Sequence, residues 1–365
     1  MKSIIIFSVL ILLCSCSNEL DEITPSAGKF SWRTLPSYIV PYQHSSGDIR
    51  TKTSSNLINW YAGYTASTTS SLFGTTSTIY NYMIPDTARK CIVLFQNSSN
   101  TIKFVEYKDG NTSWSSPASV STATSHLLPT VELYDGSVHE AHAVQEISGC
   151  YVKGSEKSGS SWSSPGYHYK TIMSAPGYAK IICDYSPTLE YHSSAGVEYL
   201  VTVDVDNEFS GYGLPYVYWR YNTTNFTSTT SPAIGLGVTS GELNASITPV
   251  ALEDNGDDKL YLFFTYPGTS TQATNRIYFY IGSVTGSTNG AITSWDGPFE
   301  VGGGAYTSNK IDGIFIDESE RIVIIYKNCY TDEIDIAYSD DFGDNWSIET
   351  DIAVTTGAPS IVNLE

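Results

Sequence analysis

Residues 339–346 read SDDFGDNW and lie between two segments of alternating apolar residues. Short polar residues and a glycine at this density are typical of a tight turn. A large aromatic residue then opens the next segment. We therefore predict a strand, a turn and a second strand over residues 336–354, with the apolar face of Trp346 buried.

The same order of strand, polar turn and aromatic residue recurs along the chain, for example in YKDGNTSWSSPASV at 107–120. A second marker, usually a proline ahead of a strand, alternates with the first. Units of about 50 to 60 residues that each hold four short strands are typical of propeller blades. The repeat aromatics are Trp60, Trp114, Trp162, Phe226, Trp295 and Trp346, and the second markers are Pro85, Pro129, Pro176, Pro249, Asp312 and Pro359.

The first and last segments of the domain look like two halves of one unit. Residues 30–62 look like outer strands without an inner one, and residues 357–365 look like an innermost strand with nothing after it. Pairing the two would close a ring and remove free sheet edges. We predict an all-β fold, a six-bladed β-propeller over residues 30–365. Five or seven blades stay open, because the units at 173–235 and 245–300 carry long insertions.

Four residues of the opening stretch, Ser339, Asp341, Gly343 and Trp346, match the pattern S-x-D-x-G-x-x-W. This pattern resembles the Asp box, or BNR repeat, of sialidase-like propellers. The resemblance implies a structural turn between the third and fourth strands of a blade, on the rim away from an active site. In such a turn the Asp accepts amide hydrogen bonds, the Gly permits a positive φ, and the Trp packs between blades.

The other units are degenerate copies of this box. The turn before Trp162 keeps the spacing but has Lys157 in place of the Asp, and the turn at 109–114 keeps Asp109 and Gly110. The turn at 56–60 looks more like the turn of five-bladed glycoside hydrolases. Only one copy is therefore specific, although the repeat covers most of the chain.

The N-terminus is expected to lie outside the fold. Residues 1–15 hold one lysine and an apolar run, which is typical of a secretory signal peptide. Its end, with Cys16 after Leu13-Cys14-Ser15, resembles the lipobox of bacterial lipoproteins and implies acylation of Cys16. Residues 16–29 would then be the lipidated cysteine and a flexible tether, which places the protein at the bacterial cell envelope. An ordinary signal peptide cut nearby is the alternative.

The charge balance and the cysteine spacing argue against several classes of partner and cofactor. The chain has 38 acidic and 19 basic residues and no Lys/Arg cluster, so we expect no nucleic-acid partner and membrane contact through the lipid alone. The spacing of the remaining cysteines fits no zinc site, and we predict no cofactor. The sequence allows either disulfides or buried free thiols for Cys91, Cys150, Cys183 and Cys329.

Sialidase chemistry would require three arginines that clamp a carboxylate. The nearest match to the family's first arginine motif is Arg33, which has an extra residue before its proline. Arg220 and Arg276 lie in strand-like segments and would either join such a clamp or pair with acidic neighbours. Since none of the six predicted inner-strand starts carries an arginine, the sequence argues against a sialidase.

Another glycoside hydrolase would need two carboxylates across a central cleft. Asp86 and Asp312 are expected near the opening where inner strands begin, with Glu190 or Asp184 as a third acid. The alternative is that these residues only cap strand ends.

The segment VHEAHAVQE, residues 138–146, contains His and Glu side chains, which can bind metal ions. Alternation places Glu140 and His142 on one strand face, where they would need one more ligand to hold a cation. A solvated strand face is the preferred interpretation, and we predict no metal site.

Three functions remain after these arguments. The preferred one is a lipid-anchored, noncatalytic propeller that binds a glycan or an envelope or host protein. The tyrosine-rich segments at 183–192 and 206–222 suit such binding if they are exposed. The alternatives are an exo-acting glycoside hydrolase, sialidase-like or other, and a structural subunit of an envelope complex.

Overall fold

The protein is built almost entirely of β-strands. Its computed structural model describes residues 37–69, 71, 74–81, 89–108, 114–124, 129–134, 137–146, 149–159, 161–171, 188–192, 197–206, 214–221, 228–229, 234–235, 250–254, 258–266, 276–285, 291–302, 305–307, 311–316 and 319–363. Within these residues no helix is long and apolar enough to cross a membrane.

The described strands form six antiparallel sheets, each of which we call a blade. The first blade holds, from the centre outward, β26 (Val362–Asn363), β1 (Tyr38–Gln43), β2 (Ile49–Ser54) and β3 (Tyr61–Ser67). The second holds β4 (Thr75–Asn81), β5 (Arg89–Gln96), β6 (Thr101–Lys108) and β7 (Ala118–Thr124). The third holds β8 (Thr130–Tyr134), β9 (Ser137–Glu146), β10 (Gly149–Ser158), β11 (Ser161–Trp162) and β12 (Gly166–Thr171).

The remaining three blades follow in chain order. The fourth holds β13 (Thr188–His192), β14 (Val197–Asp206), β15 (Leu214–Tyr221), β16 (Ser228–Thr229) and β17 (Ile234–Gly235). The fifth holds β18 (Val250–Asp254), β19 (Lys259–Tyr266), β20 (Arg276–Thr285) and β21 (Ala291–Glu300). The sixth holds β22 (Asp312–Ile316), β23 (Arg321–Lys327), β24 (Ile334–Ser339) and β25 (Ser347–Glu349).

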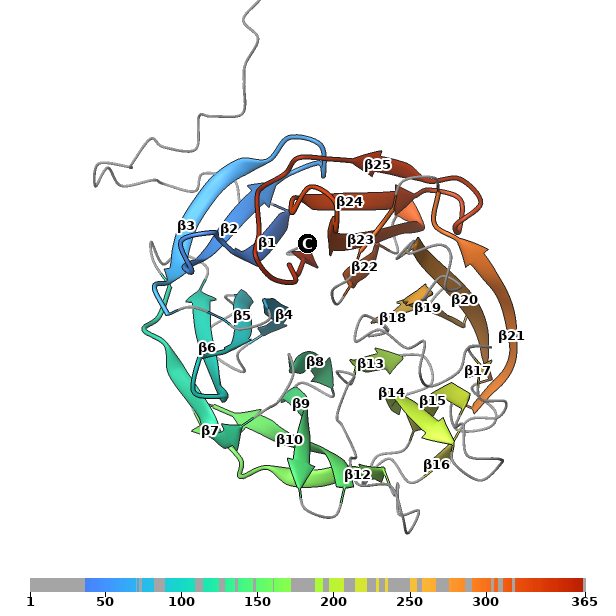
Figure 1. The fold of residues 1–365 in the computed structure, drawn as a ribbon, viewed down its shortest axis with the longest axis horizontal. Helices are drawn as coiled ribbons and strands as arrows, with labels where there is room; N and C mark the ends of the chain where they lie inside the picture. The colour runs from blue at the N-terminus through green and yellow to red at the C-terminus, as the bar shows by residue number, and fades with distance from the viewer. Residues whose placement is uncertain are drawn as a thin grey trace, which may run out of the picture.

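Figure 1 shows the blades arranged as a ring, with the first strand of each blade nearest the axis. A middle strand of such a blade is covered by neighbouring blades on both faces. This explains the composition of β23, RIVIIYK, in which every residue between the charged ends is apolar and buried. The predicted all-β propeller fold is therefore confirmed.

The ring closes where the sequence analysis placed the closure. The C-terminal strand β26 pairs with β1, with Ile39 opposite Val362, so the first blade combines an inner strand from the C-terminus with outer strands from the N-terminus. The C-terminal segment also reaches the second blade, since the Thr75 amide donates to the Ala358 carbonyl at 2.9 Å. The expected closure is therefore confirmed.

Buried hydroxyl groups reinforce this junction. Ser360 is fully buried, and its Oγ lies 3.1 Å from Thr75 Oγ1 and 2.9 Å from Ser77 Oγ. Thr75 Oγ1 also donates to the Pro41 carbonyl at 2.9 Å. Because these groups are removed from water, each hydrogen bond prevents a buried polar atom from being left without a partner.

The start of the second blade differs from the sequence-based expectation. β4 begins at Thr75, not after Pro85, because the neighbouring Gly74 already forms a parallel bridge with Ala358. Asp86 therefore follows the innermost strand in the chain instead of preceding it. In the third, fifth and sixth blades the innermost strand begins at or directly after the expected marker, at Thr130, Val250 and Asp312.

Candidate functional site

The Asp box forms the turn between β24 and β25, the third and fourth strands of their blade. The Ser339 hydroxyl accepts the amides of Asp341 (3.3 Å) and Gly343 (2.8 Å) and donates to Asp341 Oδ1 (2.8 Å). Asp341 in turn accepts the Asn345 amide (2.8 Å) and its side chain (2.7 Å), and these bonds lower the pKa of the Asp341 carboxyl. The side chains of Ser339 and Asp341 therefore form their hydrogen bonds within the turn itself.

The aromatic residue of the box joins two blades. The Trp346 indole donates its N–H to the Gly343 carbonyl at 2.9 Å and packs edge-on against Phe263 and Phe279 of the fifth blade, with ring centroids 5.9 and 5.8 Å away. Gly343 has φ 97°. A Cβ at this position would lie 2.5 Å from the Phe279 ring, so both the backbone and the space require glycine.

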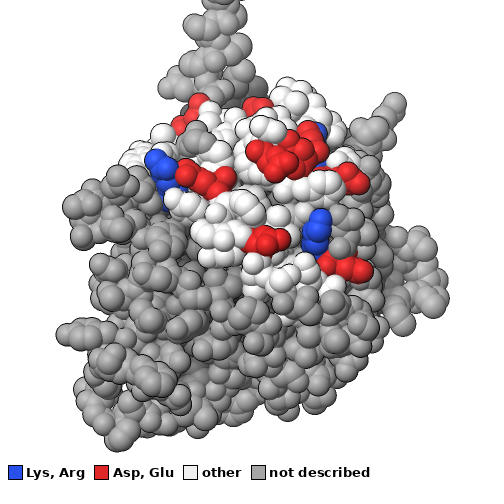
Figure 2. All heavy atoms as spheres, turned by 90° about the vertical axis from the view of Figure 1, so that its right-hand side faces the viewer, with Lys and Arg blue, Asp and Glu red and all other residues white. Residues whose placement is uncertain are grey.

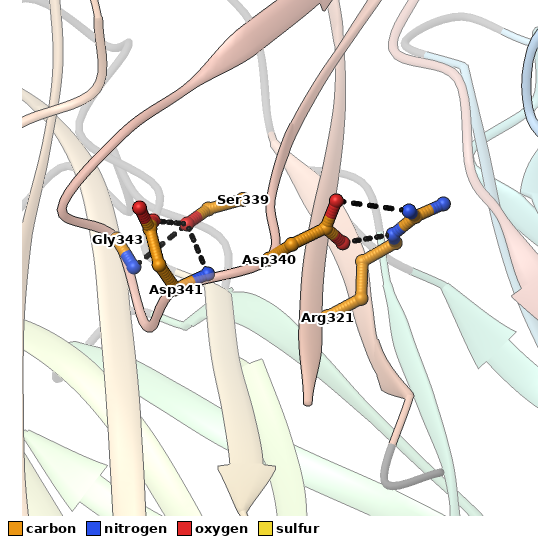
Figure 3. A network of polar contacts seen from close by, with 5 residues as sticks. All are labelled: Arg321, Ser339, Asp340, Asp341 and Gly343. Atoms are coloured by element: carbon orange, nitrogen blue, oxygen red, sulfur yellow. Dashed lines mark hydrogen bonds and ion pairs between the residues drawn. The ribbon is translucent and has the colours of Figure 1, made fainter. Parts of the chain in front are cut away.

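A bidentate ion pair holds the same turn from the strand beside it. Figure 3 shows both Asp340 oxygens facing the guanidinium of Arg321, which lies at the start of β23. The Arg321 guanidinium also lies over the Tyr338 ring, 5.0 Å from its centroid. Asp340 is exposed, so this pair adds orientation more than stability.

The first blade carries a second copy of this architecture, one residue shorter. The Ser54 hydroxyl accepts the amides of Asn56 (3.2 Å) and Leu57 (3.0 Å), and Asn56 Oδ1 accepts the Asn59 amide (2.9 Å). The Trp60 indole donates to the Leu57 carbonyl at 3.0 Å, three residues back, as Trp346 does to Gly343. Leu57 has φ 63°, which matches the positive φ of Gly343. Ser54 and Asn56 thus take the places of Ser339 and Asp341.

Four repeat aromatics, Trp60, Trp114, Trp162 and Trp346, each contact the blade that precedes their own around the ring. Trp60 packs on the cluster formed with the sixth blade, and Trp114 on the cluster formed with the first. Trp162 packs on the second blade, 5.8 Å from the Phe104 ring. Lys157, which replaces the Asp in that copy, forms an ion pair with Glu106 of the second blade at 3.0 Å.

One described repeat aromatic, Trp295, does not follow this rule. Trp295 lies inside β21, not at its start, and its ring contacts the backbone position of Gly282 on β20. It therefore packs within its own blade, because β21 is already paired with β20 from Ala291 onward. Phe226 lies outside the described residues.

Strand register separates the Asp box from the face where inner strands begin. At one end of the sixth blade lie Arg321 and Ser339, and at the other end lie Asp312 and Asp335. The β23–β24 loop, residues 328–333, belongs to this second end. This end is the one at which the resemblance to sialidase-like propellers implies a functional site.

An aromatic platform stands on the β23–β24 loop. Tyr330 is 65% exposed and meets Tyr306 in a T-shaped contact, with centroids 5.4 Å apart and planes at 81°. The Arg276 guanidinium lies 5.9 Å from the Tyr306 centroid, and its NH1 forms an ion pair with Glu300 Oε1 at 2.9 Å. Arg276 of the fifth blade thus contacts Tyr306, and Tyr306 contacts Tyr330. The Tyr330 ring remains exposed to solvent.

Three carboxyl groups lie on the other side of this loop. The side chains of Glu333 and Asp351 are hydrogen-bonded to each other, and this contact, together with burial, raises the pKa of Glu333. Asp335 interacts electrostatically with both carboxyl groups, and burial raises its pKa. Neighbouring carboxyl groups disfavour each other's charged form, which agrees with the direction of these shifts.

At the buried end of this carboxyl cluster, two polar atoms have no hydrogen-bond partner. Asp335 is 1% exposed, and its Oδ2 accepts from Asn328 Nδ2 at 2.7 Å, while its Oδ1 has no hydrogen-bond partner. The hydroxyl of Tyr326, directly opposite in the ladder and fully buried, also has none. Burial disfavours the charged form of both side chains and raises the pKa of each.

The predicted catalytic residues do not gather at one place in the described part of the chain. Asp312 begins β22, and its Oδ2 accepts the Ile361 amide at 2.9 Å, so this carboxylate links the inner strands of two blades. Arg276 is paired with Glu300. The backbone of Arg220 pairs with Leu200 and Thr229 in the fourth blade. Asp86 and Arg33 lie outside the described residues, as do Asp184 and the lipidation residue Cys16; Glu190 lies on β13.

The expectation that this face of β9 is solvated is wrong. Glu140 and His142 are 0% and 1% exposed, and His142 Nδ1 lies 2.9 Å from Glu140 Oε2. The face is covered because Val138, on the same side of β9, packs with Val131 against the second blade. Among the residues described, no group of three or more His, Cys, Asp or Glu side chains could hold a metal ion.

The structure decides between a disulfide and a free thiol for two of the four cysteines. Cys91 and Cys329 are free thiols, and burial raises the pKa of Cys91 above its ordinary value. No side-chain position is described for Cys150 or Cys183.

Sequence reasoning missed the β23–β24 loop as a site. The signal was present in KNCYTDE, residues 327–333, where a tyrosine and two acids share a short turn opposite an Asp box. The tyrosine-rich segments at 183–192 and 206–222 gave a stronger signal in the sequence, because they hold more aromatic residues.

No known protein family profile matches the sequence, and no curated protein matches it. Solved structures do match. A fungal lectin from Aleuria aurantia, described as a six-bladed β-propeller with a novel fucose recognition mode, aligns with a TM-score of 0.57 at 12% identity, covering 86% of this chain and 89% of that one. A variant of AofleA from Arthrobotrys oligospora aligns with a TM-score of 0.54 at 11% identity, covering 90% and 87%.

A protein of unknown function from Dyadobacter fermentans is similar to the same degree. It aligns with a TM-score of 0.52 at 12% identity, covering 91% of this chain and 93% of that one. At these identities the similarity concerns the fold, and it shows that the chain is a β-propeller.

Proposed function

We propose that this protein is a noncatalytic, lipid-anchored propeller of the bacterial cell envelope that binds a glycan at the β23–β24 loop. The observation that carries the proposal is the exposed ring of Tyr330, which contacts Tyr306. Rigid aromatic faces stack on the apolar faces of sugar rings. Tyr330 lies at the end of the blade opposite the Asp box.

The position of one predicted carboxylate supports binding over hydrolysis. Glycoside hydrolases hold two carboxyl groups at least about 5 Å apart, so that the sugar or a water fits between them. Asp312, the described member of the predicted pair, accepts the Ile361 amide at 2.9 Å and so links two inner strands.

The anchor is proposed from the sequence alone. Cys16 follows an apolar signal and the tripeptide Leu13-Cys14-Ser15, and residues 16–29 would act as the tether. A Cys16→Ser variant should lose incorporation of labelled palmitate and leave the membrane fraction. Unchanged membrane retention in that variant would contradict lipid anchoring.

Glycan binding is tested with the purified full-length chain on an array that includes neutral, amine-bearing and acidic saccharides. Tyr330→Ala should abolish binding, because the stacking face is lost. Tyr61→Ala is the matched control, since Tyr61 is an equally exposed tyrosine (64%) on the outer strand β3. The proposal fails if no glycan binds, or if Tyr330→Ala and Tyr61→Ala affect binding equally.

A further inference from the structure

We infer that the turn between β2 and β3 of the first blade lies against the lipid bilayer, through the exposed side chains of Ile58 and Tyr61. This inference rests on the lipid anchor proposed above and adds the face that the anchored domain turns toward the membrane. The β23–β24 loop, which carries Tyr330, then points away from the membrane.

The chain enters the first blade at the end that carries this turn. β1 begins at Tyr38, and Tyr38 lies opposite Ser54, the residue from which the turn to β3 starts. Residues 17–36 separate this entry point from Cys16, the proposed lipid site. A segment of about 20 residues spans at most about 70 Å, even when it is fully extended. The anchor therefore keeps the entry point within this distance of the bilayer, so that even weak contacts with lipid form repeatedly at this end.

Two large apolar side chains of this turn are exposed. Ile58 is 56% exposed and Tyr61 is 64% exposed. Their neighbours Leu57 and Trp60 pack into the cluster shared with the sixth blade, so the turn is already fixed without Ile58 and Tyr61. A tyrosine beside an isoleucine suits the boundary between lipid and water, where the ring lies among lipid and the hydroxyl reaches water.

The sixth blade shows that the turn itself does not require these two residues. Counted from the tryptophan of each turn, Ile58 corresponds to Asp344. In the same way Tyr61 corresponds to Ser347, and both polar residues of the sixth blade are exposed. The two turns share the serine hydroxyl that accepts turn amides. Because the architecture accepts polar residues at both positions, the apolar pair of the first blade serves a contact outside the fold.

Charge distinguishes this turn from the rest of the chain. Residues 53–85 contain no Asp, Glu, Lys, Arg or His, although the chain has a formal net charge of −19. Figure 2 views the molecule from the side of β21, away from β3, and shows acidic side chains gathered on the described surface. Anionic headgroups repel carboxylates. The uncharged turn and β3 therefore approach a bilayer without this repulsion.

The test measures the hydrogen exchange of backbone amides by mass spectrometry. The lipidated chain on vesicles of phosphatidylethanolamine and phosphatidylglycerol is compared with the Cys16→Ser chain in solution. We expect exchange at residues 55–64 to slow about fivefold on the vesicles, because lipid excludes water from the turn. Exchange at residues 328–333, at the opposite end of the sixth blade from its Asp box, should be unchanged.

The informative variant is Ile58→Asp/Tyr61→Ser, because the sixth blade carries these residues at the same positions. It should lose the slowing on vesicles while it stays bound through its lipid, and unchanged exchange in solution checks that its turn is intact. Val354→Asp is the matched control. Val354 is 48% exposed, but the Thr355 amide beside it donates to the Asp332 carbonyl of the β23–β24 loop, at the opposite end. This variant should retain the slowing at residues 55–64.

The outcomes separate this inference from the anchor. If Cys16 carries no lipid, both fall. If the lipidated chain shows no slowing at residues 55–64, or if the slowing survives in Ile58→Asp/Tyr61→Ser, the membrane contact is wrong and the anchor stands. Slowing at residues 328–333 instead would reverse the orientation and overturn the inference. Slowing at residues 55–64 that appears in solution as the concentration of the Cys16→Ser chain is raised would assign this surface to a second copy of the chain, and would also overturn it.

Discussion

The indole of Trp346 stands edge-on to the ring of Phe279, across the boundary between two blades, with centroids 5.8 Å apart and planes at 66°. Truncating Trp346 to alanine removes this contact and the one to Phe263. We expect the free energy of unfolding to fall by about 3 kcal/mol, the lower end of the range for buried tryptophans, because the ring is only partly buried. Denaturant titration measures the change.

Trp346→Phe is the control for this prediction, since it keeps an aromatic ring at the blade boundary and should lose less stability than the alanine variant. Glycan binding in the folded fraction should be unchanged in both variants, because the Asp box lies at the other end of the blade. Loss of binding by a fully folded variant would show that the box takes part in the site.

A second prediction concerns Gly343, whose φ of 97° and contact with Phe279 exclude a side chain. Gly343→Ala should destabilise the fold by more than about 1 kcal/mol, because the substitution adds both backbone strain and a clash. Gly166→Ala is the matched control, since a Cβ there meets no atom within 4 Å. A similar melting temperature for the two variants would disprove the steric argument.

The third prediction tests the ring closure. Ser360→Ala removes the hydroxyl that contacts both Thr75 and Ser77, and it takes away the acceptor of the buried Ser77 hydroxyl. The expected loss is about 1–3 kcal/mol in the free energy of unfolding. Ser99→Ala, in an exposed turn of the second blade, should stay within about 0.5 kcal/mol of the wild type. Equal stability of the two variants would mean that the buried hydroxyls do not hold the junction.

The fourth prediction is a pH dependence that originates at Asp335. Burial raises its pKa in the folded state, so its protonated form favours folding and the contribution is lost as pH rises through the folded-state pKa. The stability of the wild type relative to Asp335→Asn should therefore fall as pH rises from below about 4 toward neutrality. Urea titrations of both proteins across this range check the sign. A relative stability that rises with pH would contradict it.

The repeat and its closure could be predicted from sequence because the turns punctuate the chain regularly. One intact box, from Ser339 to Trp346, was enough to identify degenerate copies, and the unmatched segments at both ends required a shared blade. The copy at Ser54 was harder to identify. Asn56 replaces the Asp and one residue is missing, yet the hydrogen bonds to turn amides are retained.

The position of the second blade's inner strand could not be predicted, because it depends on a partner distant in sequence. Pro85 matched the local pattern, but the bridge between Gly74 and Ala358 starts β4 earlier. Local markers describe a strand's own preferences and carry no information about the edge against which it pairs.

The burial of Glu140 and His142 could not be predicted for a related reason. Alternation along β9 correctly places both on one face, but it does not say whether that face meets water. In a propeller the middle strands are covered on both sides, so polar residues there are found in pairs, as the 2.9 Å contact between these two shows.

The pairing of Ile39 with Val362 also has a consequence for biogenesis. The first strands to leave the ribosome cannot complete their blade until the segment containing Val362 has been made and, if the protein is exported as we propose, translocated. Until then the inner edge of β1 has no permanent partner, which makes it a template for pairing with other chains. A nascent chain of this topology therefore exposes the inner edge of β1 until its C-terminal strand arrives.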